Sequence, residues 1–201
     1  MADLAGELRS ALAADGLPSS DYDLNPDTQL SPKRTLRSAA VLIPVIDRPA
    51  KASVILTKRS SALKHHPGQI AFPGGKVDEA DDGAVDAALR EAREEIGLER
   101  RHADVLGALP PHETVTGFQV TPVLALVTPE FKPRPEPGEV AEAFQVPLDH
   151  VLNPERFLIE SRRWRGERRF YFVVPWGPYY IWGATARILR ALADRMPNVE
   201  A

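Results

Sequence analysis

The 201-residue chain contains no cysteine. This absence excludes disulfide bonds, thiol catalysis and metal sites built on thiolate ligands. A bound metal ion must therefore be held by oxygen or imidazole, and clustered carboxylates would favour a hard ion such as Mg²⁺ or Mn²⁺. No apolar run approaches the roughly 20 residues that a membrane-spanning helix requires. The acidic, mixed-polarity start does not resemble a signal peptide, so we expect a cytoplasmic protein without a membrane partner.

A strong excess of charge of either sign is also missing. The chain carries 25 basic and 28 acidic residues, for a net charge of −3. This balance disfavours bulk nucleic acid and anionic membranes as partners. The length allows one domain with a full core, or one domain plus arms. We expect an N-terminal helix and polar arm over residues 1–34, one domain over residues 35–196 and a tail over residues 197–201.

The apolar spacing predicts a mixed α/β (α+β) fold, in which helices flank a mixed sheet. The expected helices cover residues 3–14, 83–96 and about 181–192. The expected strands cover residues 39–46, 52–57, 69–72, 105–109, 120–127 and 143–146, with a hairpin formed by residues 157–159 and 169–174. The strand over residues 39–46 is nearly all apolar, which predicts a central place in its sheet.

The helix over residues 83–96 carries an unusual pair of carboxylates. Its expected apolar face contains Val85, Ala88, Leu89, Ala92 and Ile96. Glu91 and Glu95 are four residues apart at the edge of this face, so two like charges lie side by side. A divalent cation between them would relieve the repulsion. A solvated, metal-free glutamate face is the alternative on periodicity alone.

A Gly74-Gly75 turn precedes this helix and adds to the metal interpretation. Glycines between a strand and a helix let an ion or ligand approach the backbone closely, and a free carbonyl could complete a metal's coordination. The stretch from Gly75 to Leu98 then resembles the Nudix hydrolase signature G-x5-E-x7-R-E-U-x-E-E-x-G-U, in which U is a bulky aliphatic residue. It departs from the signature in three ways: Asp81 takes the first acidic position, the gap before Arg90 is one residue longer, and Ala92 fills the first U position.

An upstream block is similar to the motif of one branch of that family, the coenzyme A pyrophosphatases. It reads Leu56-Thr57-x-Arg59-Ser60-x3-Lys64-x3-Gly68-x3-Phe72-Pro73-Gly74-Gly75. The branch has arginine where this chain has Lys64, which keeps the charge and loses the planar fork. The branch also carries the longer gap and the alanine in the helix. Residues 109–111, 115–123 and 182–186 agree as well, so the resemblance runs from about residue 39 to residue 192.

The resemblance implies an α/β/α sandwich with a mixed central β-sheet and a Mg²⁺- or Mn²⁺-dependent hydrolase. The expected reaction cleaves coenzyme A, or its derivatives, into 4′-phosphopantetheine (or its acyl form) and adenosine 3′,5′-bisphosphate. Glu91 and Glu95 would bind the metal, and the Gly74 carbonyl would be a backbone ligand. Glu94 would bind the metal directly or contact one of its ligands. Arg90 would hold the carboxylates in place by charge-assisted hydrogen bonds.

The general base is expected outside the signature, because Nudix enzymes often use a loop glutamate. Glu139 is the preferred candidate, Glu113 and Glu142 are rivals, and an ordinary solvated role for Glu139 is equally supported. The substrate-binding residues implied by the branch motif are Arg59, Lys64, Gly68 and Gly75. His65 and His66 are poor metal ligands, because adjacent side chains cannot easily reach one ion.

A basic hairpin is the last candidate feature and comprises Arg162, Arg163, Arg165, Arg168 and Arg169. It reads either as a solvated turn paired with Glu160 and Glu167 or as a dock for the 3′-phosphate of coenzyme A. It is also the one feature that would favour RNA. The alternative functions are hydrolysis of ADP-ribose, a dinucleoside polyphosphate or an oxidised nucleotide, and an inactive ligand sensor. The sequence leaves open whether the N-terminal helix mediates a homodimer.

Overall fold

The computed structural model describes residues 3–31, 33–48, 51–164 and 166–196, so the expected tail lies outside the described residues. The α-helices are α1 (Leu4–Ala13), α2 (Ala84–Ile96), α3 (Leu148–Val151) and α4 (Ala184–Ala193). The strands are β1 (Ser19–Ser20), β2 (Arg37–Ile46), β3 (Ser53–Arg59), β4 (Ile70–Ala71), β5 (Gly74–Lys76), β6 (Ala103–Ala108), β7 (His112–Glu113), β8 (Phe118–Val127), β9 (Val140–Pro147), β10 (Leu158–Trp164) and β11 (Glu167–Val173). Short 3₁₀ helices, η1 and η2, cover Arg100–His102 and Pro154–Arg156. Within these ranges, no helix is both long and apolar enough to cross a membrane.

The main sheet is mixed, as predicted. Its nine strands follow the order β1-β7-β8-β2-β3-β4, while β5, β6 and β9 pair with β2, β8 and β3. β2 runs parallel to β8 along its whole length, whereas β3 and β9 are antiparallel. The predicted central place of the first long strand is confirmed, since β2 pairs with β3, β5 and β8.

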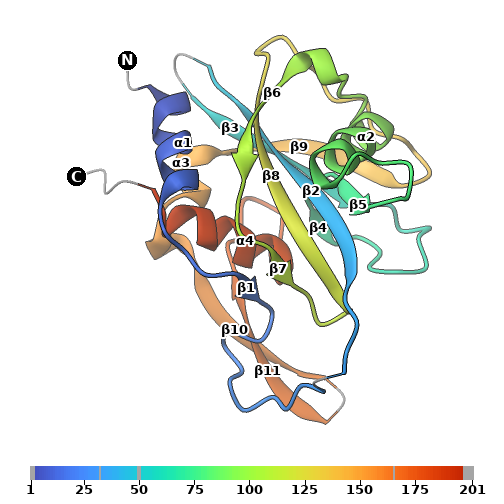
Figure 1. The fold of residues 1–201 in the computed structure, drawn as a ribbon, viewed down its shortest axis with the longest axis vertical. Coiled ribbons are helices and arrows are strands. Elements are labelled where there is room, and N and C mark those ends of the chain that lie inside the picture. Colours follow the sequence, from blue (N-terminus) through green and yellow to red (C-terminus); the bar gives the residue numbers. More distant parts are fainter. Residues whose placement is uncertain (1–2, 32, 49–50, 165, 197–201) are drawn as a thin grey trace.

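Helices cover both faces of this sheet, which confirms the predicted three-layer architecture. The side chains of β2 alternate between two buried clusters: Ile43 and Val45 belong to one, and Leu42 and Ile46 to the other. α2 packs against the second cluster, whereas α1, α3 and α4 contribute to the first. Figure 1 shows α2 on one side of the sheet and those three helices on the other.

The segments that the sequence did not indicate as strands are short or polar. β1 consists of two serines, and β5 begins with two glycines, residue types that are depleted in strands. β10 and β11 confirm the predicted hairpin but extend through its arginines. The helix predicted at residues 3–14 is confirmed as α1, and its Leu8 and Ala11 are fully buried. The boundary drawn at residue 34 stays a prediction.

Candidate active site

The helix α2 presents the carboxylates at the edge of a buried face, as the periodicity predicts. Ala88, Ala92 and Ile96 are buried against the sheet, and Glu95 beside them is only 4% exposed. The prediction was wrong for Val85, which is exposed, because the buried face turns toward Ala87 in the first turn. The helix ends at Gly97, whose left-handed backbone (φ 69°) is the conformation that favours glycine at a helix end.

The two glycines of β5 bring the backbone close to the carboxylates. The Gly74 N–H donates a hydrogen bond to Glu95 Oε2 at 3.3 Å. A Cβ atom on Gly75 would lie 2.4 Å from Glu91 Oε1, so the Glu91 carboxylate occupies the space that any side chain there would need. A Cβ on Gly74 would lie 2.4 Å from the Ala40 carbonyl oxygen of β2. The glycines therefore permit both the sheet pairing and the carboxylate position.

Arg90 connects the acidic side chains to one another. Its guanidinium makes a two-point contact with Asp81, with nitrogen–oxygen distances of 2.8 and 2.9 Å. It also donates to Glu91 Oε1 at 2.9 Å and to Glu94 Oε2 at 3.3 Å. These bonds are the contacts that the predicted orienting role of Arg90 requires, and the role itself stays a prediction. The motif position of Asp81 was recognised in the sequence, but its contact with Arg90 was not, because that contact depends on the conformation of the loop before α2.

The charges of this cluster are strongly perturbed. Burial raises the pKa of Glu95 to about 8 and also raises the pKa of Glu91. The hydrogen bonds from Arg90 lower the pKa of Asp81 to about 2. Glu95 thus differs from its neighbours: it is buried, and in the described part of the chain it has no ion pair. Burying a carboxylate that has no ion pair is costly, so a cation bound beside Glu95 would stabilise its charged form.

The side chains do not already enclose an ion. Within the residues that the structure describes, no three histidine or acidic side chains are gathered as a metal site. Glu91 and Glu94 are instead turned to Arg90. The attraction of the two carboxylates to the guanidinium accounts for this arrangement.

The proline-rich loop before β9 is fixed to the end of α2. The Arg134 and Glu136 N–H groups donate to the carbonyl oxygens of Ile96 and Glu95 at 2.8 and 2.9 Å. These bonds satisfy carbonyls that the last helical turn leaves without partners. The loop then leads to Glu139, whose negative charge contributes to the raised pKa of both Glu91 and Glu95. Glu139 therefore lies near the carboxylates of α2.

The rival glutamates are bound elsewhere. Glu113 forms an ion pair with Arg34 at 2.8 Å, and Glu142 accepts a 2.5 Å hydrogen bond from the Tyr179 hydroxyl. Neither glutamate is among the causes of the raised pKa of Glu91 or Glu95, of which burial is the largest. Of the three candidates, only Glu139 combines proximity to this cluster with an exposed side chain and no hydrogen bond of its side chain within the described residues.

The upstream block reaches the same region through Arg59. This residue ends β3, and its positive charge partly offsets the raised pKa of Glu95. Backbone bonds from Arg59 N–H to Gln69 O and from Gly68 N–H to Arg59 O close the loop over residues 60–68. Gly68 has a left-handed backbone (φ 72°), which explains the glycine. Lys64 is exposed on this loop.

Comparison with known proteins agrees with this geometry. A family model described as the NUDIX domain matches residues 36–165. A protein named uncharacterized Nudix hydrolase NudL, from Cronobacter sakazakii, is 43% identical over 157 residues, which cover 78% of this chain and 81% of that protein. NudL of Escherichia coli K12 has the same identity and coverage.

Solved structures give the same fold. A Nudix hydrolase from M. smegmatis, RenU, superimposes with a TM-score of 0.50 and 25% identity, over 69% of this chain and 83% of that one. A MutT/nudix family protein from Enterococcus faecalis has a TM-score of 0.53 at 15% identity, over 97% of this chain and 74% of that one.

Proposed function

This chain belongs to the Nudix hydrolase family, and we propose that it hydrolyses the diphosphate linkage of coenzyme A or its acyl or oxidised derivatives. This proposal rests on the proximity of the upstream block, residues 56–75, to the signature helix α2. Arg59 and Gly68 close one loop, and the charge of Arg59 acts on Glu95 of α2. This proximity supports the proposal that the residues indicating the substrate and those indicating the chemistry belong to one site.

A divalent cation fits the residues of this site. Glu91 and Glu95 would hold Mg²⁺ or Mn²⁺, with Glu94 and the Gly74 carbonyl as further oxygen ligands, a donor set that hard cations prefer. The buried, unpaired state of Glu95 supports this assignment. When bound, such an ion neutralises diphosphate charge and acidifies a water molecule.

The side chains around the ligands have distinct roles in this mechanism. Arg90 orients Glu91 and Glu94 through the bonds described above. Glu139 accepts the proton of the water that attacks phosphorus, and the bond from that phosphorus to the bridging oxygen breaks. Arg59 and Lys64 bind the oxygens of the diphosphate by charge-assisted hydrogen bonds. Gly75 leaves the space in which Glu91 lies beside the substrate.

Product analysis tests the substrate assignment. Incubation of coenzyme A with the protein and Mg²⁺ or Mn²⁺ should yield 4′-phosphopantetheine and adenosine 3′,5′-bisphosphate, detected by mass spectrometry. ADP-ribose, a dinucleoside polyphosphate and an oxidised nucleotide serve as competing substrates. Intact coenzyme A in a reaction that consumes one of these would contradict the assignment and leave the family chemistry in place.

Replacing Glu139 with glutamine tests the general base. Loss of a positioned base lowers kcat by about 10²- to 10⁴-fold. Metal affinity, followed by Mn²⁺ titration, should change little, because Glu139 is not among the proposed ligands. Glu130→Gln, an exposed glutamate of the same loop, is the matched control. Near-normal kcat in Glu139→Gln together with a large loss in Glu142→Gln would transfer the role to Glu142.

A further inference from the structure

The β10–β11 hairpin forms a small sheet of its own, apart from the main sheet. Its two strands pair in one unbroken register. Figure 1 shows the hairpin at one end of the molecule, with the N-terminal arm passing beside it. Arg165, in the turn of the hairpin, lies outside the described residues. A sheet of two strands has two outer edges, and each edge presents backbone groups that can bind a further partner.

The outer edge of β11 is already covered. The Asn25 side chain accepts a hydrogen bond from the Phe170 N–H at 2.8 Å and donates one to the Phe170 carbonyl oxygen at 2.9 Å. The Phe172 carbonyl oxygen accepts a hydrogen bond from the Gly183 N–H at 3.2 Å. The N-terminal arm and the start of α4 therefore occupy this edge.

The outer edge of β10 is open. Because Phe170 directs its backbone groups outward, its cross-strand partner Ser161 directs its own N–H and carbonyl away from the hairpin on the other side. The same alternation turns the backbone groups of Ile159 and Arg163 outward. Within the described residues, these outward groups have no hydrogen-bond partner. Leu158 and Ile159 are also 50% and 57% exposed, so no other part of the chain covers this edge.

An open and regular edge strand is a template for a strand of another chain. Proteins usually protect such an edge with a bulge, a proline or a covering segment, and the described part of β10 has none of these. Its charged side chains, Glu160, Arg162 and Arg163, are the protection that it does have. Their order determines which partner strand the edge accepts.

A second copy of the chain fits this edge in one register. Opposite residues of neighbouring strands project to the same face, so a two-fold axis perpendicular to the sheet must pass through a residue of β10. An axis at Glu160, Arg162 or Arg163 would place two like charges opposite each other, which is destabilising. An axis at Ser161 pairs the strand along its whole length and places Glu160 opposite Arg162 of the partner subunit.

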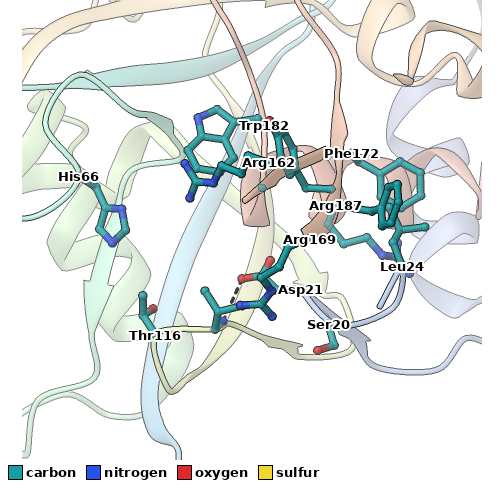
Figure 2. Close-up of a pocket in the computed structure, with 14 residues that line it drawn as sticks. Ser20, Asp21, Leu24, His66, Thr116, Arg162, Arg169, Phe172, Trp182 and Arg187 are labelled. Atoms are coloured by element: carbon teal, nitrogen blue, oxygen red, sulfur yellow. Dashed lines mark hydrogen bonds between the residues drawn. The ribbon is translucent and has the colours of Figure 1, made fainter. Parts of the chain in front are cut away.

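Both of these charged side chains retain groups for the contact. Glu160 accepts a hydrogen bond from the Tyr180 hydroxyl at 2.6 Å through one carboxylate oxygen, and the pairing with hairpin arginines that the sequence suggested is absent from the described contacts. The Arg162 guanidinium lies 4.3 Å from the centre of the Trp182 ring, and Figure 2 shows it beneath the indole. Stacking uses the face of a guanidinium and leaves its in-plane N–H donors for other partners.

Strand alternation separates the hairpin arginines into two pairs. Arg162 and Arg169 line a cleft between the hairpin, the N-terminal arm and the start of α4, whereas Arg163 and Arg168 point to the other face of the hairpin. The Asp21 carboxylate lines the same cleft, so we do not assign the cleft to a phosphate. Arg162 is exposed at its rim, where a partner strand can reach it.

We infer that the protein forms a symmetric dimer by antiparallel pairing of the two β10 strands about an axis at Ser161. The two hairpins then form one continuous sheet, in which Ile159 exchanges backbone hydrogen bonds with Arg163 of the partner subunit. The apolar stem of that arginine covers the exposed Ile159 side chain. The inference is independent of the proposed substrate.

Sedimentation velocity of the full chain over a range of concentrations tests the inference. The wild type should sediment as a dimer that dissociates on dilution, and Ser161→Pro should raise the dissociation constant at least about tenfold. The N–H that proline removes points away from β11, so the hairpin keeps its own ladder and the far-UV circular dichroism should not change. Ser161→Ala, which keeps the N–H, is the matched control and should dimerise like the wild type.

Exchange of charges provides a second test. Glu160→Arg or Arg162→Glu alone places like charges across the interface and should raise the dissociation constant at least about tenfold. The double variant restores opposite charges in reversed order and should recover most of the dimer. A wild type that is monomeric at every concentration, or a dimer that is unchanged in Ser161→Pro and in both single charge variants, would overturn the inference. A double variant as weakly dimeric as the single variants would contradict the register.

Discussion

Glu95→Gln is expected to lower kcat/KM by at least about a thousandfold, the largest single effect in this protein. Glutamine keeps the size of the side chain and loses the negative charge that would hold the cation. A metal ion contributes several kcal/mol to diphosphate cleavage, and each 1.36 kcal/mol corresponds to a tenfold change in rate. Steady-state kinetics with saturating Mn²⁺ measure the loss. Glu79→Gln, an exposed glutamate before the helix, is the control.

The same variant should be more stable than the wild type when both are metal-free. Burial raises the pKa of Glu95 from 4.5 to about 8, so the fold loses stability as the pH rises through this interval. Glutamine does not ionise and removes that loss. At pH 8 without metal, we therefore expect a higher Tm for Glu95→Gln, and added Mn²⁺ should raise the Tm of the wild type only. A Mn²⁺-induced rise in the variant equal to that of the wild type would contradict the ligand role.

Gly75→Ala should lose activity with little loss of stability. The new Cβ would approach Glu91 Oε1 to 2.4 Å, and Glu91 is the end of a flexible side chain that can move away. Mutations that disturb the orientation of a metal ligand typically cost about 10- to 100-fold in metal affinity or activity, and we expect Gly75→Ala to lose at least as much. Mn²⁺ titration and steady-state kinetics measure the two losses.

Gly74→Ala is the paired variant and should lose stability, in contrast to Gly75→Ala. Its Cβ would approach the Ala40 carbonyl oxygen to 2.4 Å, and this backbone atom of the central strand cannot yield easily. Overpacking of this kind costs about 1–3 kcal/mol, or roughly 2–4 °C of Tm per kcal/mol in a domain of this size. Full activity in Gly75→Ala would show that catalysis does not require the observed position of the Glu91 carboxylate.

The elements with strong periodicity were predictable because their side chains alone report their environment. The ten-residue strand β2 alternates between two cores, and α2 has one buried face. Both patterns are visible without the fold. β1 and β5 carry no such signal, since their strand conformation comes from pairing with β7 and β2. Val85 was wrongly assigned to the buried face because that face turns toward Ala87 in the first helical turn.

The α2 carboxylates were also predictable, because their spacing along one helix fixes their common face. Glu139 was one of three candidates in the sequence, since glutamates in loops have no periodicity. Its nearness to Glu91 and Glu95 depends on the bonds from Arg134 and Glu136 to the end of α2. The contact of Asp81 with Arg90 likewise depends on a loop conformation.

The sequence by itself determined the family, the mixed sheet and the carboxylate helix, because each depends on local spacing that a single segment carries. The tertiary structure decided the partners of the carboxylates: Arg90 for Asp81 and Glu91, and the Gly74 N–H for Glu95. It also separated the hairpin arginines into a pair facing a cleft and a pair facing away. These outcomes depend on contacts between segments far apart in the chain, such as the N-terminal arm and the hairpin, and no local pattern encodes such contacts.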